Sequence, residues 1–397
     1  MEELTYALIT PYSLVKSRTG GIIGRLLALA DLDLVAARMF IFSDAFVDAY
    51  MAMICPEDID PKLGEAWRDY LDMNLRVAHS TRYTPRCMVL LFRGPNAARH
   101  LKNDVIGSFT EVPVGDTIRG TFGDLIRSRR GRIRHFEPAV ITAPVPALAR
   151  RHLDLLARHS AADGGVLTDR VSFDTPGTVQ TTLVLLKPET VAMRGRQPGN
   201  VIDAISRTGL KIVGARLVGM TVATAEALYG HLRERFKVSL RGDLAREVYA
   251  RLHAAFPFTF TMHDADIVSD LLAERNATAE FNRIVRYLTG VDPDEVTDPD
   301  NRRTAGRAHC LALLYRGPDA VAKVNSVMVG INPIRKDTGE YRSEFARNLV
   351  RTGAHASATG DEAERDRAIV GLADNGDDPA EFADIIRTYL ERKAARA

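Results

Sequence analysis

The sequence repeats one pattern of residues, and this repeat constrains the fold more than any other feature of the chain. Residues 5–39 resemble residues 181–217 at an offset of 177. A second pair of segments, 90–102 and 313–325, matches at an offset of 223. The second copy therefore holds about 45 additional residues between its two matching blocks. Two copies of one domain are expected in tandem.

Both copies have the same expected order of secondary structure. An apolar, β-rich run ends at a proline in each copy, Pro11 and Pro188, which removes a backbone donor and stops a strand. A helical stretch, a β-branched strand, a second helix, a third strand and a third helix follow. This order predicts an α+β fold of two tandem ferredoxin-like sandwiches, each a mixed sheet covered by helices.

The boundaries follow from the matching blocks and from composition. We expect a first domain at 1–135, a connector at 136–180 and a second domain at 181–397. The insertion in the second domain is expected at about 237–305, because helix-like runs there end in the polar turn cluster "VDPDEVTDPDN".

Composition narrows the class of protein. The 397 residues carry a formal net charge of +2, so nucleic acid is not an expected partner of the whole chain, although residues 127–135 are locally basic. Cys55, Cys87 and Cys310 have neither metal-site nor disulfide spacing, which fits a reducing compartment. The opening "MEELTYALIT" has acidic residues where a signal peptide needs basic ones, and no apolar stretch approaches the length of a membrane span. A cytoplasmic protein without a membrane partner is expected.

Four motifs in the second copy carry a family resemblance: "TTLVLLKPETV", "ALYGHLRERF", "GEYRSEF" and "HASATGDEAERD". In this order the second copy resembles the nucleoside diphosphate kinases. The family places its phosphorylated histidine ten residues after the phenylalanine of the arginine block, and ten residues after Phe345 stands His355. The family's serine falls on Ser357, and its glutamate falls on Asp366 within "AERD".

The resemblance gives these residues roles that suit their chemistry. An imidazole such as that of His355 can attack a terminal phosphoryl group if one ring nitrogen is free and the ring is held still. Asp366 would accept the other ring N–H and fix the tautomer, over a longer distance than the family's glutamate or through a bridging water. Lys187 and Arg342 would place positive charge around the phosphoryl oxygens.

The resemblance also implies a nucleotide cleft. Tyr229 would line the site, and it would donate to the phosphoryl group or buttress the histidine. Phe236 and Leu349 fall on the two positions that sandwich the base, and Thr352 falls where the family contacts the sugar. Mg²⁺ would arrive bridging the phosphates of the nucleotide.

Several positions depart from the family pattern. The second phosphate-binding arginine falls on Ser326, and the neighbouring threonine falls near Ile331. Lys323 or Arg335 would be possible substitutes for the lost guanidinium. The first copy lacks more of the family's site residues. Thr10 stands at the position of the lysine, Asn103 at that of the second arginine and Arg132 at that of the histidine. Arg119 is retained, and His135 lies three residues after Arg132. The first copy is therefore expected to be a non-catalytic partner domain. It would supply packing surface, or bind a phosphate or nucleotide through the basic stretch "RSRRGRIRH" (127–135).

Three functions remain open from the sequence. The first is phosphoryl transfer from a nucleoside triphosphate through phosphohistidine to a nucleoside diphosphate. The second is the same chemistry on another acceptor, a modified nucleotide or a small metabolite, which the insertion and Ser326 favour. The third is a non-catalytic nucleotide-binding scaffold, which the altered first copy favours. The tandem copies are expected to form an intramolecular pseudo-dimer, with a homo-oligomer as a further possibility.

Overall fold

The computed structural model divides the chain into two units, which are described separately below. The first unit comprises Met1–Leu217, Leu311–Val327 and Ala356–Ala397, and the second comprises Val218–Cys310 and Met328–His355. The structure describes residues 2–54, 61–80, 83–109, 116–174, 178–192, 195, 197–331, 353–374 and 379–395.

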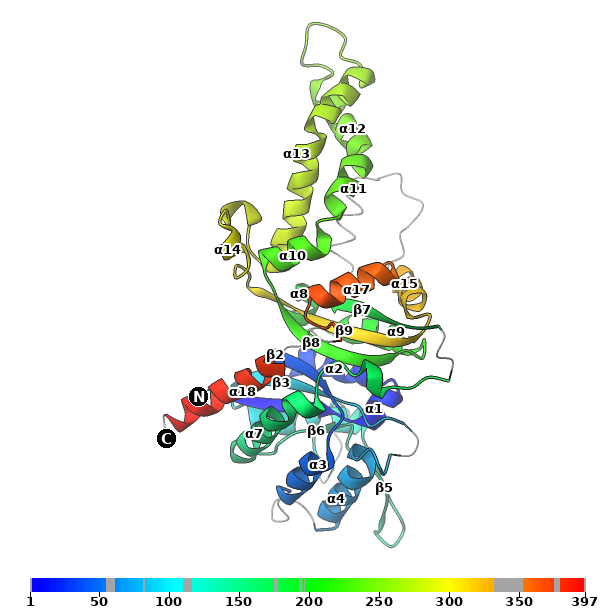
Figure 1. The fold of residues 1–397 in the computed structure, drawn as a ribbon, viewed down its shortest axis with the longest axis vertical. Coiled ribbons are helices and arrows are strands. Elements are labelled where there is room, and N and C mark those ends of the chain that lie inside the picture. Colours follow the sequence, from blue (N-terminus) through cyan, green and yellow to red (C-terminus); the bar gives the residue numbers. More distant parts are fainter. Residues whose placement is uncertain are drawn as a thin grey trace. The chain divides into compact units, whose positions relative to one another are not determined.

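The first sheet has the strand order β2-β3-β1-β6 (Figure 1). Its strands are β1 (Glu2–Ile9), β2 (Asp33–Phe40), β3 (Cys87–Pro95) and β6 (Val140–Ile141). β3 pairs antiparallel with both β1 and β2, and β6 pairs antiparallel with β1. The expectation of a mixed sheet is wrong here, because β3 lies between β1 and β2 and separates these two co-directional strands.

The second sheet has the order β10-β7-β9-β8, which is the same arrangement of successive strands. Its strands are β7 (Val179–Leu186), β8 (Lys211–Met220), β9 (Ala308–Pro318) and β10 (Ala354–Ala356). The antiparallel register also repeats, since Tyr6 lies opposite Leu91 and Leu183 lies opposite Leu314. These pairs are related by the offsets of 177 and 223 found in the sequence. The described residues therefore form an α+β structure with antiparallel sheets.

Short helices connect and cover these sheets. In chain order they are α1 (Pro11–Val15), α2 (Thr19–Leu29), α3 (Asp44–Ala52), α4 (Pro61–Leu75), α5 (Ala97–His100), α6 (Ile118–Phe122), α7 (Pro146–Asp163), α8 (Pro188–Ala192), α9 (Gln197–Ser206), α15 (Ala320–Ile331), α17 (Gly360–Ile369) and α18 (Pro379–Ala394). A separate hairpin is formed by β4 (Asp124–Arg127) and β5 (Ile133–Glu137). The expected domain boundary at residue 135 falls inside β5, and β6 joins the first sheet after it.

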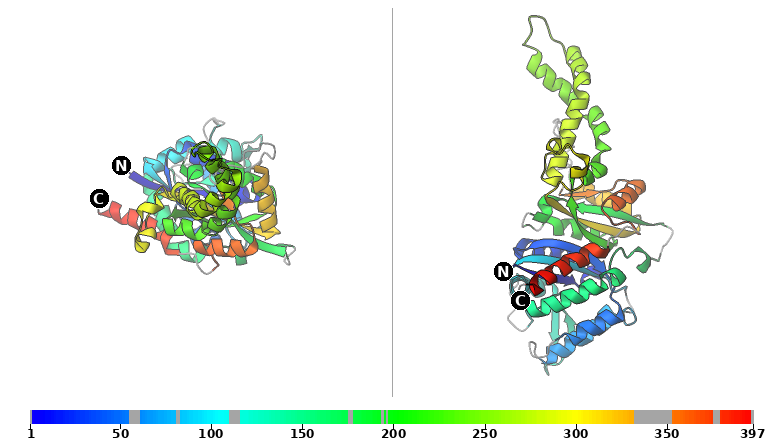
Figure 2. Two further views of the ribbon diagram at one scale, coloured as in Figure 1. Left: turned by 90° about the horizontal axis from the view of Figure 1, so that it is seen from above. Right: turned by 60° about the vertical axis from the view of Figure 1, so that its left-hand side comes forward.

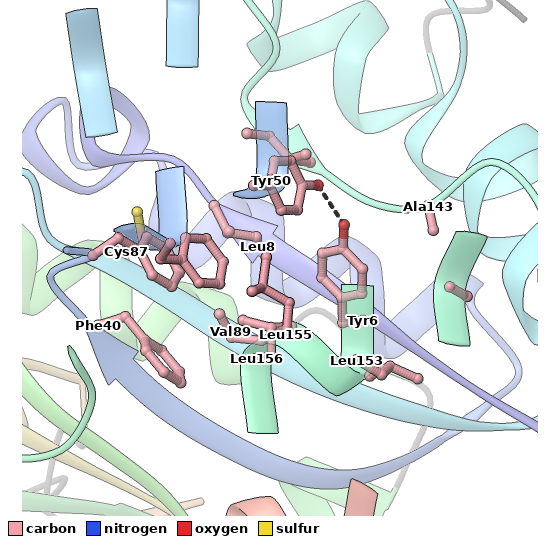
Figure 3. Close-up of a cluster of buried hydrophobic side chains, with 14 of the residues drawn as sticks. Tyr6, Leu8, Phe40, Tyr50, Cys87, Val89, Ala143, Leu153, Leu155 and Leu156 are labelled. Atoms are coloured by element: carbon pink, nitrogen blue, oxygen red, sulfur yellow. Dashed lines mark hydrogen bonds between the residues drawn. The ribbon is translucent and has the colours of Figure 1, made fainter. Parts of the chain in front are cut away.

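An extensive apolar core surrounds the first sheet (Figure 3). The C-terminal helix α18 packs along α7 and against β2, and it contributes Phe382, Ala383 and Ile386 to this core (Figure 2). The ring of Phe382 meets the ring of Phe40 edge-on at 5.6 Å between centroids. Residues at the end of the chain thus complete the core of the sheet that begins it.

Helices α2 and α9 cross at two glycines. A Cβ on Gly20 would lie 2.2 Å from the carbonyl oxygen of Gly199, and a Cβ on Gly199 would lie 2.3 Å from that of Gly20. Asp203 in α9 also accepts hydrogen bonds from the backbone N–H groups of Gly20 and Gly21. Only residues without a Cβ allow the two helix backbones to approach this closely.

The second unit is mainly helical. Its helices are α10 (Val222–Tyr229), α11 (Leu232–Ser239), α12 (Arg241–Leu252), α13 (Met262–Thr289) and α14 (Pro299–Arg302). α12 and α13 lie side by side (Figures 1 and 2), and Arg241 in α12 forms an ion pair with Asp270 in α13. Thr261 starts α13 with a capping box, and Gly290, at φ +72°, ends it. None of the described helices combines the length and the apolar character needed to cross a membrane.

Candidate functional site

His355 lies in a short strand whose entry is set by a glycine. Gly353 has φ +65°, a left-handed conformation that residues with a Cβ rarely adopt, and β10 begins at the next residue. His355 is partly exposed within β10. Two residues later the backbone N–H of Ser357 donates to the carbonyl oxygen of Leu183 in β7, at 3.4 Å.

Ser357 and Asp366 form the most completely buried polar pair among the predicted site residues. The Ser357 hydroxyl donates to Oδ2 of Asp366 at 2.9 Å, and both residues are 0% exposed. Arg365 donates to Oδ1 of Asp366 from Nε at 3.0 Å and from Nη2 at 2.7 Å. Both carboxylate oxygens are therefore held in place, and Arg365 is a positioning residue that the sequence analysis did not single out although it stands in the "AERD" motif.

The helix that carries Asp366 is fixed at its start. Thr359 caps α17 by accepting a hydrogen bond from the backbone N–H of Glu362 at 3.1 Å. The Glu362 side chain in turn accepts from the backbone N–H of Ala358 at 2.8 Å. These bonds set the geometry between the strand end and the helix, so the Ser357–Asp366 distance is determined by local structure.

Asn325 in α15 supports the same turn from outside the predicted motifs. Its amide donates to the carbonyl oxygens of Ser357 at 3.3 Å and Ala358 at 3.2 Å. The adjacent Ser326 is exposed on α15. The position of the family's second arginine thus lies directly after a residue that contacts the Ser357 backbone.

Lys187 follows β7 and precedes the proline that starts α8. Its side chain is 1% exposed, which is unusual for lysine. The neighbouring Glu189 lies in the first turn of α8. Burial raises the pKa of the Glu189 carboxyl, while its own backbone hydrogen bond and the charge of Lys187 oppose that rise. A buried cation is thereby placed at the carboxyl end of the first strand of the second sheet.

Tyr229 and His355 meet within the second unit. Tyr229 ends α10, which Thr221 starts by accepting from the backbone N–H of Thr224. The two rings lie 5.1 Å apart between centroids at 69°, an edge-to-face contact, and Tyr229 is 0% exposed. A buried aromatic ring therefore lies against the imidazole; whether Tyr229 buttresses the histidine or donates to a phosphoryl group stays a prediction.

Phe236 lies in α11, which packs against α13, and its side chain is 1% exposed. Its contact with a nucleotide base stays a prediction. Three further predicted residues, Arg342, Leu349 and Thr352, lie outside the described residues, as does Arg335.

The corresponding region of the first copy is filled by its own side chains. Thr10, at the lysine position, donates to Oε1 of Glu137 at 2.9 Å, and the Tyr70 hydroxyl donates to Oε2 at 3.0 Å. Burial raises the pKa of the Glu137 carboxyl, and these hydrogen bonds lower it by less. At the position that corresponds to Lys187, the first copy thus has a neutral hydroxyl that is hydrogen-bonded to a buried carboxyl group.

Arg119, the arginine retained in the first copy, serves the fold. It donates to the carbonyl oxygens of Gly107 at 2.8 Å and Val140 at 3.1 Å. Its guanidinium lies over the rings of Trp67 and Phe109, at 5.4 and 5.3 Å from their centroids. Burial lowers its pKa to about 10. The guanidinium of Arg119 thus contacts other groups of the protein itself.

The expected counterpart of His355 in the first copy must be corrected. The offset of 223 points to Arg132, but Arg132 lies in the β4–β5 hairpin. In the second sheet β10 is the edge strand beside β7, and in the first sheet β6 (Val140–Ile141) is the edge strand beside β1. The hairpin adds residues before β6, so the offset of 223 does not reach this strand. β6 contains no histidine, and His135 is exposed in β5 beside the ring of Tyr12.

About half of the chain is similar to curated proteins named nucleoside diphosphate kinase. The protein of Methanobrevibacter smithii is 22% identical over 188 residues, which cover 47% of this chain and 84% of that protein. The protein of Halorhodospira halophila is 22% identical over 188 residues, covering 47% and 89% respectively. The protein of Methanosarcina mazei is 24% identical over 191 residues, covering 48% and 87%. The resemblance predicted from the motifs is thus confirmed over about half the chain.

A solved structure described as an NDP kinase from Pyrobaculum aerophilum is 22% identical, covers 48% of this chain and 94% of that chain, and has a TM-score of 0.30. No protein-family model matches the sequence.

Proposed function

We propose that this chain is a phosphotransferase of nucleoside diphosphate kinase type, with His355 as the nucleophile. The observation that carries the proposal is the buried hydrogen bond from Ser357 to Asp366, which joins the two ends of the "HASATGDEAERD" motif. Ser357 follows His355 by two residues, and Asp366 is the residue that the resemblance assigns to orienting the imidazole. The distant relatives support the same class of enzyme.

The reaction would have two matched steps. An imidazole nitrogen of His355 attacks the terminal phosphorus of a nucleoside triphosphate, the N–P bond forms, and the P–O bond to the departing diphosphate breaks. In the second step a terminal oxygen of a diphosphate attacks the phosphohistidine, and the imidazole leaves. Lys187 and Arg342 would balance charge on the transferring group, and Tyr229 would hold the ring.

Magnesium would enter as part of the substrate. Among the described residues, no group of three or more His, Cys, Asp or Glu side chains is placed to hold a metal ion. Mg²⁺ retains several waters and is bound largely through substrate phosphates in enzymes of this kind. The nucleotide would therefore carry the ion, and the protein's own contribution would be the imidazole and its cationic surroundings.

A second candidate is phosphoryl transfer to a different acceptor. The exposed Ser326 at the position of the family's second arginine, and the burial of Phe236 in the helical insertion, favour it. Both features alter the part of the cleft that the family uses for a plain nucleotide. The nucleophile and the donor would be unchanged.

Labelling tests the proposal. The protein is incubated with γ-labelled ATP and magnesium, and the phosphoenzyme is examined for acid lability and base stability, which phosphohistidine has and phosphoserine lacks. His355→Ala should abolish the label, and the exposed His135→Ala is the matched control that should retain it. Full labelling of His355→Ala would refute the assignment. A chase with a panel of diphosphates then separates the two acceptor classes.

A further inference from the structure

The β4–β5 hairpin has a fixed tip. Ser128 N–H donates to the carbonyl oxygen of Arg132 at 2.7 Å, and Gly131 N–H donates back to that of Ser128 at 2.9 Å. The Ser128 hydroxyl also accepts from the backbone N–H of Arg132 at 3.1 Å. Gly131 has φ +78°, which a glycine adopts without strain. The turn therefore has a defined backbone, and its side chains project from a determined frame.

This hairpin carries a dense single-sign charge. Five arginines and a histidine stand between residues 127 and 135, and the stretch 125–136 contains no acidic residue. All six basic side chains are exposed. Four of the arginines form no ion pair with any described residue, namely Arg129, Arg130, Arg132 and Arg134. Like charges at such short spacing repel one another, so an anionic partner would stabilise the arrangement.

The arginines also share one hollow surface. A cavity of about 910 Å³ is lined only by hairpin residues, which are Ile126, Arg127, Ser128, Arg129, Arg130, Arg132, Ile133 and Arg134. A second cavity of about 540 Å³ lies between the hairpin and α4, and Glu65 and Asp69 stand on its α4 wall. An anion would avoid those carboxylates. The first hollow, which has arginines and no carboxylate, is the surface that fits an anionic ligand.

We propose that the β4–β5 hairpin binds duplex DNA through its phosphate backbone, without reading sequence. A two-stranded ribbon is narrow enough to enter the major groove of B-form DNA. Its guanidinium groups can then hold phosphates on both sides by paired hydrogen bonds. The near-neutral chain as a whole gave no reason to expect nucleic acid, and the inference concerns this local charge alone.

Other anionic partners fit the hairpin less well. The tip sequence "RSRRGR" offers no aromatic or large apolar residue to enter a membrane interface. A protein interface would need a buried aromatic or aliphatic anchor at its centre, and the tip supplies none. A-form duplexes have a major groove too narrow for side chains, so duplex RNA is a poorer match than duplex DNA. A regular row of phosphates is the partner that five spaced guanidinium groups match best.

Binding of a short random-sequence DNA duplex to the full chain, followed by fluorescence anisotropy over a series of salt concentrations, tests the proposal. Each phosphate neutralised contributes a slope of about −0.9 to the dependence of log affinity on log salt. A variant with alanine at residues 129, 130, 132 and 134 should lose at least about tenfold in affinity at low salt and reduce the slope by about 3 to 4. Lysine at the same four positions should keep most of the slope, because the charge remains.

Controls separate charge at the hairpin from charge in general. A matched variant with four exposed arginines elsewhere changed to alanine should bind like the original protein; these are Arg99, Arg151, Arg158 and Arg170. Thermal unfolding and phosphoenzyme labelling should be unchanged in the hairpin variant, since its residues belong to an exposed turn. Equal binding by the hairpin alanine variant would overturn the proposal. So would binding of anionic vesicles, ATP or single-stranded RNA in preference to the DNA duplex.

Discussion

The hydroxyl of Ser357 donates to Oδ2 of Asp366 at 2.9 Å, and neither residue has any exposed surface. Two motif residues that lie nine positions apart are thus joined inside the protein. Burying a carboxyl group costs free energy unless donors satisfy its oxygens, and here Ser357 and Arg365 supply them. The Ser357–Asp366 hydrogen bond is therefore expected to stabilise the folded protein, in addition to any role beside His355.

Ser357→Ala should destabilise the protein. The change removes one donor from a buried carboxylate, which costs about 1 to 3 kcal/mol of the free energy of unfolding. Urea denaturation measures this cost. Ser326→Ala, on the exposed face of α15, is the control and should stay within about 0.5 kcal/mol of the original protein. Equal stability of the two variants would mean that the Ser357–Asp366 bond contributes nothing to folding.

The sequence predicted the strands but not the fully antiparallel pairing of the sheets, and the strands were predictable because similar apolar runs recur at fixed offsets. The offsets that align Tyr6 with Leu183 and Leu91 with Leu314 also align the register of β1 with β3 and of β7 with β9. Register is fixed wherever one face of a strand is buried, so two similar apolar runs adopt similar pairings. The class of fold and the resemblance to nucleoside diphosphate kinases were accessible for this reason.

The parts that sequence did not predict depend on contacts between distant segments. β6 has only two residues, too few to show the alternation of apolar and polar side chains that marks a strand. The sequence therefore did not reveal that the β4–β5 hairpin precedes the edge strand, and the offset pointed to Arg132 in the hairpin as the counterpart of His355. The burial of Phe236 could not be predicted, because an amphipathic pattern does not say which face of a helix is covered. The packing of α18 on the first sheet joins residues more than 340 positions apart, such as Phe40 and Phe382. No local pattern encodes such contacts.

His152 should make stability depend on pH. Its Nδ1 lies 2.8 Å from the Tyr6 hydroxyl, which lies 2.5 Å from that of Tyr50 (Figure 3). Burial, and to a lesser extent the charge of Arg151, lowers the pKa of His152 to about 3, against 6.5 when unfolded. Between these two pKa values the unfolded chain therefore binds a proton at His152 that the folded protein does not bind. The free energy of unfolding should not depend on His152 above pH 6.5, and it should decrease toward pH 3 by up to about 1.4 kcal/mol per pH unit.

Comparison with His152→Gln isolates this contribution. Glutamine can still form a hydrogen bond with the Tyr6 hydroxyl but does not titrate, so the difference in free energy of unfolding between the two proteins should narrow as the pH falls below 6.5. Denaturation at a series of pH values measures the difference. The exposed His263→Gln is the control and should show no such trend. A difference that is constant from pH 4 to pH 8 would contradict the burial argument.

Two glycine substitutions should have opposite signs. Gly199→Ala places a Cβ 2.3 Å from the carbonyl oxygen of Gly20, so α2 and α9 must separate, at a cost of about 1 to 3 kcal/mol. Gly64→Ala, inside α4, meets nothing within 4 Å and should stabilise by about 0.5 to 1 kcal/mol through lower backbone entropy. Thermal unfolding distinguishes the two. If both changes stabilise the protein, the α2–α9 contact is not as close as described.

Ser326→Arg should raise the rate of phosphoryl transfer if the proposed function is correct. Ser326 is exposed on α15, next to Asn325, whose amide holds the Ser357 backbone. A guanidinium there would meet charge that develops on the transferring group, and such a donor typically changes the rate by about 10²- to 10³-fold. The gain should appear mainly in kcat, because an interaction made only in the transition state leaves ground-state binding unaltered. The rate of transfer from ATP to ordinary nucleoside diphosphates measures the gain.

Ala322→Arg, at an exposed position one turn earlier on the same helix, is the matched control for added charge and should have no effect. The gain should also disappear when His355→Ala is combined with Ser326→Arg. If Ser326→Arg leaves diphosphate transfer unchanged in a folded protein, the position is not a vacant phosphate clamp, and transfer to another acceptor becomes the better account of the same histidine.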